Sequence, residues 1–126
     1  MKVLYAEDNL MNQRIVLFSL KKANYEVTIA NDGIEAIRAF NENKFDLILM
    51  DLMMPNMDGF AATIRIREIE TINNLKKTPI IALTANSMNN EREQCFSIGM
   101  DGFLTKPFSL EQLKLTLIDL DLSSHL

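Results

Sequence analysis

The chain has 126 residues, of which 48% are hydrophobic and 24% are charged, and its formal net charge at pH 7 is −4. This length and composition predict one globular domain, residues 1–126, with a core of its own. The acidic balance argues against direct binding of nucleic acid. A single cysteine excludes an intrachain disulfide, and no apolar run is long enough to cross a bilayer. We therefore expect a cytoplasmic module without membrane contact of its own.

Short apolar runs alternate along the chain with segments of helical periodicity. The runs that predict strands cover residues 2–6, 25–30, 45–51, 79–84 and 102–105. The segments that predict helices cover about residues 9–22, 33–43, 59–69, 88–98 and 109–120. Because no connection is short enough for antiparallel pairing, we predict an α/β three-layer sandwich around a five-stranded parallel sheet. The strand order 2-1-3-4-5 puts the two continuously apolar strands, the third and fourth, in the interior of the sheet.

Apolar positions within each helix predict the face that packs on the sheet. The predicted buried stripes are Met11, Ile15 and Phe18, then Ala36, Ile37 and Phe40, then Ala62, Ile66 and Ile69, and finally Leu110, Leu113, Leu117 and Leu120. A second apolar face of the last helix, formed by Leu115, Ile118 and Leu122, would suit a partner. The fourth helix is poor in apolar residues, so we expect it to be the helix that moves most readily.

Ionisable and hydroxyl side chains stand where four of the predicted strands end. They are Glu7 and Asp8 after the first strand, Asp51 at the end of the third, Thr84 at the end of the fourth and Lys106 after the fifth. The carboxyl ends of parallel strands meet at one edge of the sheet, so these side chains should lie together. Three crowded carboxylates repel one another and take up protons unless a cation neutralises them. Such a set of hard oxygen ligands suits Mg²⁺.

The remaining two side chains at this edge favour phosphate chemistry. Lys106 supplies a positive charge and Thr84 a hydroxyl donor, and both groups suit phosphate oxygens. An aspartate can act as a nucleophile and become an acyl phosphate. The metal and the lysine would then stabilise the charge on the transferring group. The pattern predicts a phosphoryl-transfer site in which Asp51 is the acceptor.

The chain resembles, over essentially its whole length, the receiver domain of two-component response regulators, because four motifs follow one another in the order found in that family. They are Glu7-Asp8-Asn9, Asp51 with Met54-Pro55-Asn56-Met57-Asp58-Gly59 behind it, Leu83-Thr84-Ala85-Asn86, and Lys106-Pro107-Phe108. The resemblance implies a flavodoxin-like fold and a phosphoacceptor switch rather than an enzyme acting on other substrates. It also implies that a histidine kinase or a histidine phosphotransfer domain donates the phosphoryl group. Asn12-Gln13 and the motif around Thr84 resemble receivers attached to hybrid histidine kinases.

The resemblance also implies a ligand set for the metal. Asp8, Asp51 and the backbone carbonyl of Met53 would bind Mg²⁺ directly, and Glu7 would act through water.

Further roles follow from the same resemblance. Lys106 would contact the phosphoryl group on the acceptor, and Thr84 would move to meet it. Phe103 would be the switch aromatic, and Gly59 a structural position. Pro107 matches a proline that is usually cis in this family. Phosphorylation would rearrange the face formed by the fourth helix, fifth strand and fifth helix, through which two receivers could also pair.

Other protein classes fit less well. A haloacid-dehalogenase-like phosphatase also uses an aspartate nucleophile, but it needs a second acid at the position that Met53 occupies. A flavodoxin-like flavin carrier needs a first loop that accepts phosphate, which Glu7 and Asp8 would repel. A degenerate receiver that only binds partners would not bind Mg²⁺. The only histidine, His125, lies in a polar tail and is a poor candidate for a phosphoryl donor.

Overall fold

The computed structural model describes residues 1–85 and 89–120, and its elements alternate as predicted. The strands are β1 (Lys2–Ala6), β2 (Glu26–Ala30), β3 (Leu47–Asp51), β4 (Ile80–Thr84) and β5 (Gly102–Thr105). The helices are α1 (Leu10–Lys22), α2 (Gly33–Glu42), α3 (Gly59–Ile72), α4 (Asn89–Ser97) and α5 (Leu110–Asp119). Three residues named above lie outside the described residues: Asn86, Leu122 and His125. Position 88, the first residue of the predicted fourth helix, lies outside them as well.

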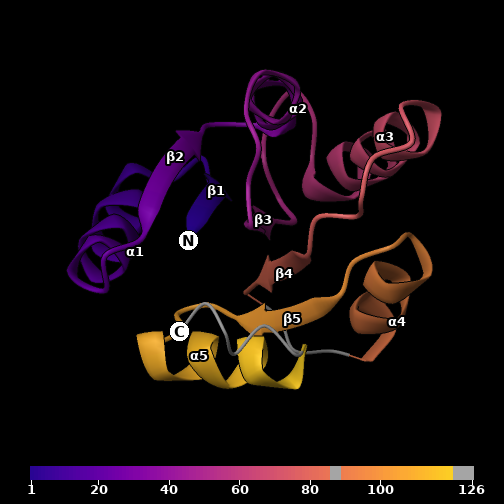
Figure 1. The fold of residues 1–126 in the computed structure, drawn as a ribbon. Helices are drawn as coiled ribbons and strands as arrows, with labels where there is room; N and C mark the ends of the chain where they lie inside the picture. The colour runs from indigo at the N-terminus through magenta and orange to yellow at the C-terminus, as the bar shows by residue number, and fades with distance from the viewer. Residues whose placement is uncertain (86–88, 121–126) are drawn as a thin grey trace.

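The five strands form one parallel sheet in the order β2-β1-β3-β4-β5, so the predicted fold class is confirmed. One apolar cluster joins the sheet to α1 and α5, and a second joins it to α2, α3 and α4. The molecule is therefore a three-layer sandwich with helices on both faces of the sheet (Figure 1). Among the described residues, no helix is both long and apolar enough to cross a membrane.

Burial along the strands follows from their apolar patterns. Every residue of β3 and of β4 is buried, as expected for continuous apolar runs inside a parallel sheet. The alternating strand β2 lies at an edge, where its residues are alternately exposed and half-buried up to a buried end. The two buried strands β3 and β4 carry Asp51 and Thr84 at their carboxyl ends.

Helix α1 corrects one prediction. Met11, Ile15 and Phe18 are 61% to 71% exposed instead of packing on the sheet. The buried residues of this helix are Gln13 and Leu20, which occupy the opposite phase. Leu20 packs in the apolar cluster, while the Gln13 amide finds hydrogen-bonding partners at the end of β1. Helical spacing revealed an apolar stripe, but this stripe faces solvent.

The other helix faces agree with their patterns. Ala62, Ile66 and Ile69 of α3 are buried, and so are Leu113 and Leu117 of α5. The predicted second apolar face of α5 is exposed, since Leu115 and Ile118 are 62% and 50% exposed. Side chains also cap the starts of two helices: Asn9 accepts from the backbone N–H of Asn12, and Ser109 and Gln112 make a capping box.

Candidate functional site

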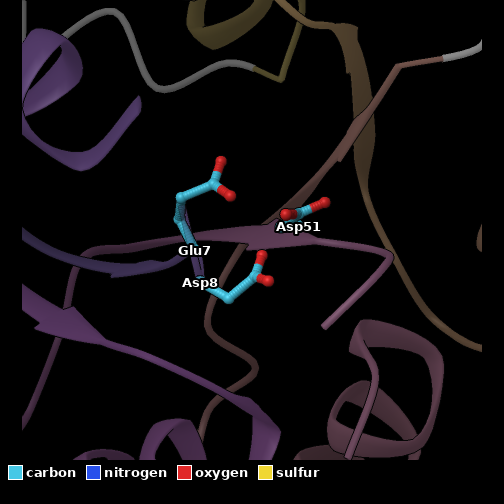
Figure 2. Close-up of side chains that lie close together, drawn as sticks. All are labelled: Glu7, Asp8 and Asp51. Carbon is cyan, nitrogen blue, oxygen red and sulfur yellow. The ribbon is translucent and has the colours of Figure 1, made fainter. Parts of the chain in front are cut away.

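The carboxylates of Glu7, Asp8 and Asp51 come together at the carboxyl edge of the sheet (Figure 2). Each offers an oxygen that lies within 4.8 Å of the oxygens of the other two. They meet because β1 and β3 are neighbours in parallel register, with Ala6 opposite Met50. Glu7 and Asp51 are buried, whereas Asp8 is exposed. A cation bound here would therefore rest on buried carboxylates and stay accessible from the side of Asp8.

Lys106 brings the only ammonium group that contacts this cluster among the described residues. Its Nζ lies 3.1 Å from Asp51 Oδ2 and 3.4 Å from Glu7 Oε1. Its backbone N–H donates to the carbonyl of Thr84 at 2.6 Å, which ties the loop after β5 to the end of β4. The peptide bond to Pro107 is cis, as the resemblance implied.

The buried charges at this edge shift one another's pKa. Burial and then the hydrogen bond and charge of Glu7 raise the pKa of Asp51 to about 6, although Lys106 opposes the rise. Burial acts to raise the pKa of Glu7 as well, but hydrogen bonds from Asp51, the Asn9 N–H and Lys106 lower it overall. One ammonium thus faces two buried carboxylates and a third at the surface. This surplus of negative charge, on hard oxygen donors, fits a divalent cation such as Mg²⁺.

Two residues that hold Glu7 in place were missed as parts of the site. The hydroxyl of Tyr5 donates to Glu7 Oε1 at 3.4 Å, and this tyrosine is fully buried. Gln13 Nε2 donates to the carbonyl of Glu7 at 2.5 Å and to Asn31 Oδ1 at 2.8 Å. A correct phase for α1 would have placed the Gln13 amide toward the sheet and drawn attention to it. Tyr5 carries no sequence signal beyond its place in an apolar strand.

Thr84 is buried at the end of β4, one residue beyond the pair formed by Leu83 and Asp51. Its hydroxyl donates to Glu91 Oε1 on α4 at 2.6 Å. No pattern in the sequence pointed to Glu91, because the contact joins a strand end to the next helix. Phe103 of β5 is half-buried and packs against the core cluster under α3 and α4. Its role as the switch aromatic stays a prediction.

The segment after β3 approaches Asp51 closely. The backbone N–H of Met53 donates to Asp51 Oδ1 at 3.3 Å, while its side chain is 75% exposed. That its carbonyl binds Mg²⁺ stays a prediction. Gly59 begins α3, and its N–H donates to the carbonyl of Leu52 at 3.1 Å. A Cβ atom on Gly59 would overlap the carbonyl oxygen of Asp51, so this position admits only glycine without displacing the acceptor strand.

The sequence profile of the family described as "Response regulator receiver domain" matches residues 3–118. The match covers the five strands and five helices described above, apart from Lys2 at the start of β1 and Asp119 at the end of α5. The chain belongs to this family. The acidic cluster of the receiver domain lies at the switch point between β1 and β3, where a doubly wound sheet binds its ligands.

Three similar proteins place this receiver domain in two-component signalling. It is 40% identical over 125 residues to "Hybrid signal transduction histidine kinase B" of Dictyostelium discoideum, an alignment that covers 93% of this chain and 6% of the relative. The receiver domain of the histidine kinase CKI1 from Arabidopsis thaliana, complexed with Mg²⁺ and BeF₃⁻, matches with a TM-score of 0.85 and 34% identity, covering 95% of this chain and 89% of that chain.

The third is the receiver domain of the response regulator Ssk1 from Saccharomyces cerevisiae, crystallised with the histidine phosphotransfer protein Ypd1. It matches with a TM-score of 0.86 and 32% identity, covering 93% of this chain and 86% of that chain. This receiver domain spans between 6% and 15% of the length of the first curated relatives it matches.

Proposed function

We propose that this receiver domain accepts a phosphoryl group on Asp51, in the presence of Mg²⁺, from a phosphohistidine of a histidine kinase or a histidine phosphotransfer domain. The observation that carries the proposal is the setting of Asp51. Its carboxylate is buried beside a second carboxylate, Glu7, and an ammonium, Lys106, at an edge that the exposed Asp8 completes. This set combines a nucleophile, oxygen ligands and a cation for phosphate oxygens.

Asp8, Asp51 and the Met53 carbonyl would hold Mg²⁺, with Glu7 acting through water. When bound, Mg²⁺ neutralises part of the acidic charge and polarises phosphoryl oxygens. An oxygen of Asp51 forms the new bond to phosphorus, while the bond from phosphorus to the histidine nitrogen breaks and its electron pair returns to the imidazole. Lys106, already in contact with Asp51, pairs with the charge on the transferred group.

The first test is intact-mass measurement after incubation with acetyl phosphate. We expect the wild-type domain to gain the mass of one phosphoryl group when Mg²⁺ is present. With EDTA in place of Mg²⁺ the gain should be lost, because the acidic cluster then repels the incoming phosphate. Equal labelling with and without the metal, or no labelling in either condition, would rule out the proposed function.

The exposed apolar stripe of α1 is the surface that we propose the phosphodonor covers. The stripe consists of Leu10, Met11, Ile15 and Phe18, each between 61% and 71% exposed. It begins at Leu10, two residues after Asp8 of the acidic cluster, since α1 starts directly after Asn9. A donor must bring its histidine to the edge of the sheet, so a protein donor would cover neighbouring apolar surface as it docks.

Truncating this stripe should separate protein donors from small ones. In the double variant Ile15→Ala, Phe18→Ala we expect transfer from a phosphorylated histidine phosphotransfer protein to slow by at least about tenfold, because buried aromatic anchors dominate docking energy. Labelling by acetyl phosphate should not change. The matched control is Leu115→Ala, Ile118→Ala, which removes similar exposed apolar groups from α5. The donor used is the one, from a panel of such proteins, that phosphorylates the wild type fastest.

If the α1 variant accepted phosphate from that protein donor as fast as the wild type does, α1 would not be the docking surface. An equal loss in the α5 control would also contradict the assignment.

We further propose that the chain works in the cytoplasm as the receiver part of a hybrid histidine kinase. Support comes from the small share of its relatives that it spans and from their description as hybrid kinases. The face of α4, β5 and α5 would carry the output, by binding a partner or a second receiver. The exposed Leu115 and Ile118 support this use of the face.

A further inference from the structure

The hydroxyl group of Thr84 is held by a carboxylate that the phosphoryl-transfer reaction does not use. Thr84 Oγ1 donates to Glu91 Oε1 at 2.6 Å. This length is in the range of short hydrogen bonds between a hydroxyl and an ionised carboxylate, which are stronger than neutral ones. Thr84 is 4% exposed and Glu91 is half-buried, so water competes only partly for this bond.

A hydroxyl has a single proton to donate. While that proton bonds to Glu91, it is not available to an oxygen of a phosphoryl group on Asp51. Thr84 ends the strand next to the acceptor, because β3 and β4 pair with Leu83 opposite Asp51 and Thr84 is the next residue. Glu91 and a phosphoryl group on Asp51 therefore compete for one donor.

We propose that Glu91 is a positioning residue that acts through Thr84, holding the hydroxyl in the unphosphorylated domain and releasing it when Asp51 is phosphorylated. This inference rests on the proposed function. It makes the bond between Thr84 and Glu91 the link from the acceptor to α4, since Glu91 lies in the first turn of that helix.

The two ends of α4 are held in different ways. Beyond its carboxyl end, Arg67 Nε donates to the carbonyl of Gly99 at 2.9 Å, and the Arg67 guanidinium pairs with Asp101 at 2.8 Å. Arg67 is largely buried, and neither of these two contacts involves a residue of the acidic cluster. Release of Glu91 would free the first turn of α4 while the far end stays attached.

Cys95 supports the inward orientation of Glu91. Its thiol is fully buried under α4, and burial, followed by the charge of Glu91, raises the pKa of Cys95 to about 11. Glu91 thus lies on the core side of the helix. Glu93, two residues further along, is exposed and provides a natural comparison, because it shares the helix and the charge but not the contact.

The test is the affinity of BeF₃⁻, a mimic of the phosphoryl group, measured by calorimetry at saturating Mg²⁺. We expect Glu91→Ala to bind BeF₃⁻ roughly tenfold more tightly than the wild type, because a hydrogen bond to a charged group no longer holds the Thr84 hydroxyl. Glu91→Gln should fall between the two, since a neutral amide oxygen accepts more weakly. Glu93→Ala should bind within about twofold of the wild type, as a distant surface charge is screened.

Glu91→Ala in a Thr84→Val background separates the loss of the hydrogen bond between Thr84 and Glu91 from a general effect on α4. Without the hydroxyl, Glu91→Ala should no longer change the affinity for BeF₃⁻. An unchanged or weaker affinity in Glu91→Ala alone, or the same gain with and without the hydroxyl, would overturn the inference. If the wild type itself failed to bind BeF₃⁻ with Mg²⁺, the proposed function would fail, and the inference with it. If the wild type bound BeF₃⁻ but Glu91→Ala gained no affinity, only the inference would fail.

Discussion

Replacing Lys106 with methionine is expected to lower the free energy of unfolding by about 3 kcal/mol in Mg²⁺-free solution, the range for breaking a buried ion pair from one side. Lys106 Nζ is the cation that contacts Glu7 and Asp51, whose side chains are only 1% and 3% exposed. Methionine fills a similar volume without the charge. Two buried carboxylates would then face each other without a partner.

Mg²⁺ should restore most of that stability, because the ion replaces the missing positive charge and binds only the folded cluster. The measurement is urea unfolding of the wild type and Lys106→Met, each with EDTA and with saturating Mg²⁺. Lys44→Met is the matched control, since Lys44 is exposed and forms no ion pair within the described part of the chain. A Lys106→Met protein as stable as the wild type without metal would show that the lysine does not balance this cluster.

Phosphorylation of Lys106→Met should remain slow even after Mg²⁺ has restored its stability. The ammonium stabilises charge on the transferring group, and removing one such group typically lowers a rate by about 10²-fold or more. Stability and reactivity would thus respond differently to the metal.

Gly59→Ala is the second substitution for which we expect a large effect. In an ordinary helix alanine is more favourable than glycine by about 1 kcal/mol. Here the new Cβ would overlap the carbonyl oxygen of Asp51 and lie 3.0 Å from the Cα of Leu52. These are backbone atoms, so they cannot turn away as the end of a flexible side chain could. We therefore expect a net loss of stability of about 1–3 kcal/mol, the range for overpacking.

The same displacement would reach the acceptor, because the strand end that must move carries the Asp51 carboxylate. Mg²⁺ affinity, measured by calorimetry, should fall at least about tenfold, since ligand oxygens need well-defined positions around this ion. The control is Gly102→Ala, whose Cβ would meet only side-chain atoms, the nearest being Thr116 Cγ2 at 3.2 Å. Wild-type stability and Mg²⁺ affinity in Gly59→Ala would refute this role for the glycine.

Sequence patterns predicted the sheet well because its signals are local. The apolar runs that end at Asp51 and Thr84 identified the two central strands, and parallel topology then placed their ends at one edge. The acidic cluster and its contact with Lys106 followed from that geometry.

Two features could not be predicted because they depend on tertiary contacts. The stripe with Ile15 and Phe18 has the spacing of a buried face, but the phase of α1 is set by Leu20 in the core and by the hydrogen bonds of Gln13. Likewise, the bond from Thr84 to Glu91 depends on how α4 sits against β4. In both cases the arrangement is set by contacts between different elements, which the spacing of apolar residues within one helix does not predict.

Asp51 is the phosphoacceptor under the proposed function, and chemical mapping of the phosphorylated residue is the decisive measurement. Borohydride reduces an acyl phosphate, but not a free carboxylate, so a phosphorylated aspartate becomes homoserine. Trypsin releases residues 45–65 as one peptide containing Asp46, Asp51 and Asp58. After phosphorylation with Mg²⁺ and reduction, tandem mass spectrometry should find homoserine at position 51 alone, and none after phosphorylation is attempted in EDTA. Homoserine at position 46 or 58, or a labelled protein without homoserine at position 51, would contradict the assignment of Asp51 as the phosphoacceptor.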